Sequence, residues 1–373
     1  YRRQRQMCIR DRVDIVGSFL LPEKLVSARN EYAMGVIDRQ HFSMIENDAI
    51  EQLVRDQIEA GLEEITSGEF RREQWDKDFW FGLDGIRCER VESGRIYQSF
   101  DPFTDLIRFI GRISYSPTHP FFDDFSFLHK CADGLALCRQ TLPSPANLYL
   151  EILAMTDGHP ESVYPEEYRL LYDIAEAYNR TIRHFYELGC RSIQLDDTAC
   201  GFLCQSNYTK RLLQGGVDLL ALHGHIIELF NNSVAGMPSD MELSLYLSGG
   251  DTIVPEWDSL QYPDNVMPKI LSQVNVDKFY LPFDTGNDSQ LEVLRHIPEG
   301  KKVVLGLADA HSPFFENPVD IRNMLSKAAK YVPSGNLSVS PKTGFKLSSY
   351  ALRGLTYKYQ WQKLAQLRET LDV

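Results

Sequence analysis

Short apolar runs alternate with amphipathic helical patterns along nearly the whole chain, and this alternation constrains the fold more than any other feature of the sequence. The runs are strand-sized and end in polar residues, as Ser192–Asp197 does. Between them, segments such as Met44–Gly61 and Pro165–Leu188 repeat apolar residues at three- and four-residue spacing, which is typical of helices that bury one face. Strands that alternate with helices in this way predict a parallel α/β sheet.

Eight runs of this kind predict a (β/α)8 TIM barrel. An open doubly wound sheet is the alternative. It has less support, because the first run ends in Val16-Gly17-Ser18 rather than in a Gly-x-Gly-x-x-Gly turn, and no Gly-x-x-x-x-Gly-Lys-Ser/Thr motif occurs. The expected strands are Val13–Ser18, Glu64–Glu69, Ala136–Thr141, Ser192–Asp197, Met241–Leu247, Asp277–Phe283, Lys302–Ala308 and Asn336–Val339.

Residues 80–118 interrupt the alternation. Gly85–Val91 and Gly94–Phe100 flank a polar pair, which predicts a β-hairpin insertion after strand 2. Because the chain shows neither a repeat nor a low-complexity linker, we expect one TIM-barrel domain over residues 13–373. The first twelve residues carry five arginines and one aspartate and resemble the translation of a transposase adapter sequence. We interpret residues 1–12 as such an artefact, with a disordered basic arm as the alternative.

Charge and cysteine content exclude several classes of partner. A formal net charge of −13 argues against nucleic acid, because phosphate binding needs a basic surface. The body of the chain has no polybasic block and its apolar runs are strand-sized, so we expect no membrane partner. The seven cysteines include no Cys-x-x-Cys pair, which favours free thiols in a reducing cytoplasm. Cys200 and Cys204 are either two small buried residues or a metal-binding pair.

Polar residues gather where the expected strands end, and a barrel places its chemistry at that face. A mouth rich in carboxylates and hydroxyls suits a zwitterionic, amino-acid-like ligand. Carboxylates would bind its ammonium group, and backbone amides beside Ser18 would bind its carboxylate. The residues at the strand ends are Ser18, Glu69, Ser144, Asp196, Asp197, Tyr246, Ser248, Asp284, Asp309, His311, Lys342 and Thr343.

Some of these residues have a purely structural alternative. Adjacent side chains on a strand point to opposite sides, so we expect one of Asp196 and Asp197 to face the mouth and the other to cap the next helix. For Glu69, the alternative is a simple ion pair with Arg71 or Arg72. An aromatic cluster either stacks a flat ligand or belongs to the core; its members are Trp75, Phe79, Trp80 and Phe81.

Six motifs occur in order along the chain: Asp14-x-Val-Gly-Ser18, Ser67-Gly-Glu-Phe-Arg-Arg72, Gln140-Thr-Leu-Pro-Ser-Pro145, Ile193-Gln-Leu-Asp-Asp-Thr198, Val304-Leu-Gly-Leu307 and Ser340-Pro-x-x-Gly-Phe345. Together they resemble single-barrel proteins similar to the C-terminal half of cobalamin-independent methionine synthase. The resemblance implies a barrel that binds a homocysteine-like amino acid and, in the true synthases, 5-methyltetrahydrofolate.

The resemblance also implies roles for individual residues. Val16, Gly17 and Ser18 would hold the carboxylate of the amino acid. Its ammonium group would lie on Glu69 and on one of Asp196 and Asp197. Trp75 would lie near the pterin of a folate.

The same resemblance implies a zinc site of His, Cys, Glu and Cys, which supplies the substrate as a thiolate. Those four positions are Tyr246, Ser248, Pro282 and Thr343 in this chain, and none is a good zinc ligand. We therefore expect no zinc, and a folate only as a possible second substrate.

Three hypotheses about function follow. The first is a methyltransferase-like enzyme of this superfamily that does not use zinc, with Asp284, His311 and Tyr246 as candidates for the base that activates the acceptor. The second is a non-catalytic amino-acid-binding protein. The third is a cofactor-free acid/base enzyme such as a decarboxylase.

Overall fold

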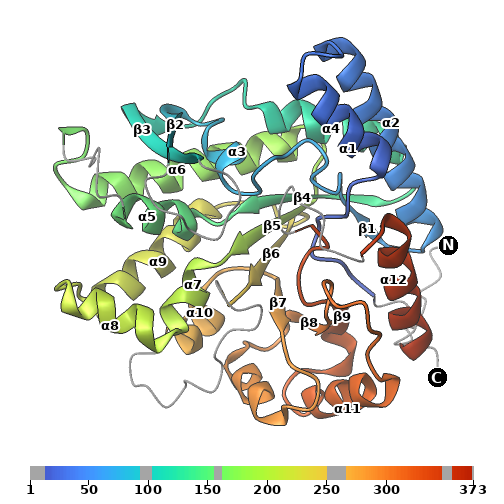
Figure 1. Ribbon diagram of the computed structural model, residues 1–373. Helices are drawn as coiled ribbons and strands as arrows, with labels where there is room; N and C mark the ends of the chain where they lie inside the picture. Colours follow the sequence, from blue (N-terminus) through green and yellow to red (C-terminus); the bar gives the residue numbers. More distant parts are fainter. Residues whose placement is uncertain (1–12, 93–102, 155–161, 250–265, 347–354, 372–373) are drawn as a thin grey trace.

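The computed structural model describes residues 13–92, 103–154, 162–249, 266–346 and 355–371, and Figure 1 shows helices arranged around a central curled sheet. The seven strands of that sheet are all parallel and follow the order β1-β4-β5-β6-β7-β8-β9. Their bounds are β1 (Glu64–Ile65), β4 (Leu137–Pro143), β5 (Ser192–Asp197), β6 (Glu242–Leu247), β7 (Lys278–Pro282), β8 (Lys302–Ala308) and β9 (Leu337–Pro341).

The eighth expected strand, residues 13–18, lies between the two edges of this sheet. Val13 forms an isolated parallel bridge with Val339 of β9, and Ser18 forms another with Gly68, just after β1. The segment therefore closes the ring that a TIM barrel requires, but through two bridges rather than through a continuous ladder. The second expected strand is also shorter than predicted, because Gly68 and Glu69 both have positive φ, at 66° and 58°.

Helices follow the strands along the chain. The longer ones are α1 (Glu23–Ala33), α2 (Arg39–Glu59), α4 (Pro120–Ala132), α5 (Pro145–Ala154), α6 (Glu167–Glu187), α9 (Leu219–Ser233), α11 (Pro318–Ala328) and α12 (Tyr357–Leu371). The shorter ones are α3 (Lys77–Trp80), α7 (Ala199–Cys204), α8 (Ser206–Gln214), α10 (Met267–Gln273), and the 3-10 segments η4 (Asp288–His296) and η5 (Ser334–Asn336). None of the helices in the described ranges is long and apolar enough to cross a membrane.

The predicted hairpin insertion is present after the second barrel strand, next to α6 in Figure 1. It pairs β2 (Asp84–Glu92) with β3 (Phe103–Ser114) in antiparallel register. The partner of β2 is thus not the predicted Gly94–Phe100, which lies outside the described residues. Packing on α6 places β3: Arg112 pairs with Asp173 at 2.6 Å, and the backbone N–H of Ile113 donates to the hydroxyl of Tyr164 at 2.7 Å.

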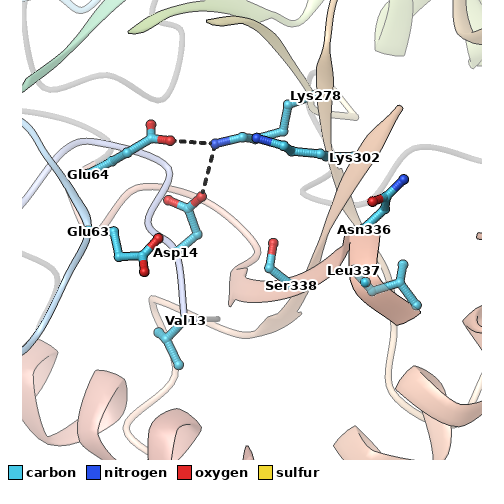
Figure 2. A pocket seen from close by; sticks show the side chains of 10 residues that line it. Val13, Asp14, Glu63, Glu64, Lys278, Lys302, Asn336, Leu337 and Ser338 are labelled. Carbon is cyan, nitrogen blue, oxygen red and sulfur yellow. Dashed lines mark hydrogen bonds and ion pairs between the residues drawn. The ribbon is translucent and has the colours of Figure 1, made fainter. Parts of the chain in front are cut away.

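A layer of paired charges fills the amino-terminal end of the barrel. Arg139, which is fully buried, lies 3.0 Å from Asp14 and 3.2 Å from Glu64. Lys278 lies 2.7 Å from Glu64 and 3.6 Å from Asp14, and Figure 2 shows its ammonium group between these two carboxylates. Burial alone would raise the pKa of Asp14, but Arg139 and Lys278 outweigh it and lower the pKa to about 2. The layer ties the first segment to the strands around it.

Candidate functional site

A pair of buried carboxylates lies at the opposite, carboxyl-terminal end of the strands. Glu69 follows β1 and Asp196 lies near the end of β5, and both side chains are buried. Burial first, and then the negative charge of Glu69, raise the pKa of Asp196 to about 8. Asp196 is therefore mostly protonated at neutral pH. A cation that binds beside Asp196 would stabilise its ionised form.

Glu69 is also part of an ion pair, which confirms the structural alternative for this residue, while its role in binding a ligand stays a prediction. Its Oε1 accepts hydrogen bonds from Arg72 and from the hydroxyl of Thr141, both at 3.0 Å. Arg71 instead pairs with Asp124 at 2.6 Å. The arginine and the threonine hold one oxygen of Glu69 in place beneath the barrel mouth.

The two adjacent aspartates point to opposite sides of β5, as alternation predicts. Asp197 accepts a hydrogen bond from the backbone N–H of Cys200 at 2.7 Å and another from the hydroxyl of Ser144. Asp197 therefore caps the start of α7, and the fully buried Ser144 supports that cap. Asp196 is the aspartate that shares the interior with Glu69.

The backbone of residues 16–18 offers donors at the same end of the barrel. Within the part of the chain that the structure describes, the N–H groups of Val16, Gly17 and Ser18 have no acceptor. Gly17 has a φ of 145°, and a Cβ added to it would lie 2.7 Å from Cγ2 of Thr141, so only glycine fits. Backbone N–H groups without an acceptor are available as donors to an anion such as a carboxylate.

The three candidate bases lie on different strand ends. Tyr246 is buried in the interior beside Val16, and its hydroxyl donates to the backbone carbonyl of Lys342 at 3.0 Å. Burial raises the pKa of Tyr246 well above its usual range, and the charge of Asp196 adds to the effect. Asp284, with a half-exposed side chain, pairs with the ammonium group of Lys342 at 2.6 Å. Lys342 thus links two of the three candidates.

His311 is the third candidate and lies on the loop after β8. Its ring is largely buried, and the backbone of Gly344 and the carboxylate of Asp309 lie near it. Burial lowers the pKa of His311 below its usual value, and the nearest carboxylate, on Asp309, lies 4.0 Å from Nδ1. A neutral imidazole of this kind is able to accept a proton at neutral pH.

The four positions at which the resemblance places zinc ligands are Tyr246, Ser248, Pro282 and Thr343, and the absence of zinc there stays a prediction. The hydroxyl of Tyr246 donates to a backbone carbonyl, that of Thr343 does the same to Gly344, and Pro282 has no donor atom in its side chain. No group of three or more His, Cys, Asp or Glu residues suited to a metal occurs within the described ranges. Cys200 and Cys204 are both buried on α7, and burial raises the pKa of the Cys200 thiol, which disfavours the thiolate that zinc needs.

The aromatic cluster divides into two parts. Phe79 and Trp80 are buried, and the indole N–H of Trp80 donates to the hydroxyl of Tyr178 at 3.2 Å, so these two residues belong to the core. Phe81 packs partly against that core. Trp75 is half-buried, and its place beside a ligand stays a prediction.

Two further residues of this region were not predicted from the sequence. Lys346 donates to the backbone carbonyl of Arg72 at 2.7 Å, and burial lowers its pKa to about 8. Gln194 is fully buried and donates to the carboxylate of Asp196 at 2.6 Å. Gln194 lies two residues before Asp196, and the alternation of a strand could have placed both side chains on the same side.

Comparison with known proteins finds similar proteins, some of which cover nearly the whole chain. The model of the family described as the catalytic domain of cobalamin-independent synthase matches residues 259–353. The chain is 32% identical to the uncharacterized protein YxjG of Bacillus subtilis over 360 residues, covering 96% of this chain and 93% of that protein. It is 22% identical to the methionine synthase of Saccharolobus solfataricus, again covering 96% and 93%.

Two solved structures share the fold over nearly their whole length. The putative vitamin-B12-independent methionine synthase of Listeria monocytogenes superposes with a TM-score of 0.76 at 28% identity, covering 96% of both chains. The B12-independent methionine synthase of Shewanella sp. W3-18-1 superposes with a TM-score of 0.68 at 19% identity, covering 97% of this chain and 96% of that one.

Proposed function

Since this chain belongs to the cobalamin-independent methionine synthase family, we propose that the mouth of its barrel binds a zwitterionic α-amino acid and acts on it without the family zinc. The observation that carries the proposal is the buried pair of Glu69 and Asp196. Although Glu69 is paired with Arg72, Asp196 stays mostly protonated beside it until a further cation binds. An α-ammonium group has the charge and the hydrogen-bond donors to satisfy both.

The other end of the ligand has a complementary site. The free backbone N–H groups of Val16, Gly17 and Ser18 suit a carboxylate. The Shewanella protein was solved in complex with selenomethionine, a ligand of the class that we propose for this chain. A folate is proposed as a second substrate, with Trp75 as its stacking surface.

The chemistry that we propose relies on protein groups alone. His311 is neutral at physiological pH and is able to accept a proton from an acceptor group. Asp284 is the second candidate base, and its carboxylate lies 2.6 Å from the ammonium group of Lys342. Tyr246 is poorly suited to this role because burial opposes loss of its proton.

A thermal-shift panel with methionine, homocysteine and folates tests the proposal, because a ligand that binds only the native state raises the melting temperature. We expect at least one amino acid to stabilise the wild-type protein and to lose most of that effect in Glu69→Gln. The matched control is Glu166→Gln, which also breaks a Glu–Arg pair spaced by three residues, but at the surface. If no amino acid shifts the melting temperature, or if both variants respond as the wild type does, the proposal is wrong.

One observation favours a second function. Asp196 is protonated at neutral pH beside an ion-paired Glu69, and two carboxyl groups in unlike states are the equipment of acid/base catalysis without a cofactor. Such an enzyme would exchange the α-hydrogen of its amino acid with solvent or release CO2, and NMR in D2O measures both. Binding without any turnover would instead indicate a non-catalytic binding protein.

A further inference from the structure

Gln194 connects two parts of the chain that are far apart in sequence. Its side chain is fully buried inside the barrel on β5. Its amide nitrogen donates to the backbone carbonyl of Val16 and to Oδ1 of Asp196, both at 2.6 Å. One planar amide group therefore contacts the first barrel segment and the buried carboxylate pair at once.

The first segment depends on such side-chain contacts. Residues 13–18 have two isolated bridges to their neighbours instead of a ladder of backbone hydrogen bonds. Three successive carbonyls of this segment accept hydrogen bonds from side chains on other parts of the barrel: Ile15 from Arg139, Val16 from Gln194 and Gly17 from Thr66. Of these three donors, Gln194 is the one that also bonds to Asp196.

We propose that Gln194 is a positioning residue that fixes the separation between the carboxylate end of the pocket, at residues 16–18, and its ammonium end, at Asp196. The effect of Gln194 on ligand binding rests on the proposed function. In an α-amino acid the two charged groups are attached to one carbon, whereas a β-amino acid has one more carbon between them. A fixed separation makes the pocket selective for α-amino acids, because a site loosened by about 1 Å loses much of its discrimination.

The position of Gln194 has a consequence that is measurable without any ligand. The charged and titratable groups that face Asp196 are Glu69, Arg72, Arg139 and Tyr246. Among these, Glu69 raises the pKa of Asp196, whereas Arg72, Arg139 and the hydrogen bond from Gln194 lower it. In Gln194→Met that hydrogen bond is lost, so the pKa of Asp196 rises above its wild-type value.

The experiment compares the wild type with Gln194→Met and with a control, Gln360→Met. Gln360 is also fully buried and also bonds the N-terminal segment, through the backbone N–H of Leu20 at 2.8 Å, but it does not contact Asp196. Titration of protein carrying 13C-labelled aspartate, with the Asp196 signal identified through Asp196→Asn, gives the pKa in the ligand-free state. Calorimetry with methionine and with β-homomethionine gives the selectivity.

We expect Gln194→Met to raise the pKa of Asp196 and to reduce the preference for methionine over β-homomethionine by about tenfold. Gln360→Met should lose stability yet keep the wild-type pKa and preference. An unchanged pKa in Gln194→Met overturns the inference, whatever the binding data show. Wild-type protein that binds no amino acid refutes the proposed function instead, and the ligand-free titration still decides the role of Gln194.

Discussion

Replacing Asp196 by asparagine should remove the coupling between amino-acid binding and proton release. With a pKa of about 8, Asp196 carries its proton in about 0.9 of the ligand-free molecules at pH 7. An ammonium group that binds beside it requires the ionised form, so binding at pH 7 should release about 0.9 of a proton. The need to deprotonate Asp196 weakens the apparent affinity about tenfold at that pH, which corresponds to about 1.4 kcal/mol.

The direction of the pH effect follows from the raised pKa of Asp196. Affinity should rise about tenfold per pH unit up to pH 8 and then level off, since Asp196 is ionised above its pKa. The affinity of Asp196→Asn should stay constant over the same pH range, so this variant should fall further behind the wild type as the pH rises. The same shift affects folding: the contribution of Asp196 to stability is present below its unfolded pKa near 3.8 and is lost as the pH rises through about 8.

Isothermal titration calorimetry of methionine in buffers with different ionisation enthalpies measures the number of protons released. Asp240→Asn is the control, because Asp240 is a surface carboxylate paired with Arg191 at 3.0 Å. We expect a proton release near 0.9 at pH 7 for the wild type and for this control, and near zero for Asp196→Asn. An affinity that stays constant from pH 6 to pH 9, or equal proton release in Asp196→Asn and the wild type, would refute the assignment of Asp196.

Three further predictions concern the metal, the backbone and the barrel interior. Protein purified without chelators should contain far less than one zinc per chain by mass spectrometry, because Tyr246, Ser248, Pro282 and Thr343 offer no suitable donors; stoichiometric zinc that survives mild chelation would contradict this. Gly17→Ala should lower the free energy of unfolding by about 1–3 kcal/mol in urea titrations and weaken methionine binding, since its Cβ would lie 2.7 Å from Thr141. Arg139→Met should lower the free energy of unfolding by about 3–5 kcal/mol, because it leaves the carboxylates of Asp14 and Glu64 with one buried cation, Lys278, in place of two; a loss below about 1 kcal/mol would show that the charge layer is dispensable.

The sequence predicted best those strands that are buried on both faces. Residues 192–197 and 302–308 were expected as strands and form β5 and β8 with the same bounds, because long apolar runs that end in polar residues leave little choice of register. The second expected strand ends early because Gly68 and Glu69 adopt positive φ. That conformation is easy for the glycine, but for the glutamate it depends on its bonds to Arg72 and Thr141, and a linear pattern does not show such partners.

The residues at the strand ends of the candidate site were predictable from the sequence, but the hydrogen bonds between residues far apart in the chain were not. Strand ends pointed to Asp196 and Asp197, and alternation predicted their opposite roles. Gln194 was missed because its role depends on Val16, 178 residues away in the chain. The second strand of the hairpin was predicted at the wrong residues for a similar reason. Its position, β3, depends on Tyr164, which lies before α6, and on Asp173, which lies in α6.

The two ends of the barrel carry different kinds of polar group. At the amino-terminal end, Asp14 and Glu64 are neutralised inside the ring by Arg139 and Lys278, so that removing any one leaves a buried charge. At the carboxyl-terminal end, the hydroxyls of Tyr246 and Thr343 donate to backbone carbonyls of the same region. A hydroxyl satisfied in this way needs no counter-charge. Substitutions of these hydroxyls should therefore leave the charge layer that closes the barrel undisturbed.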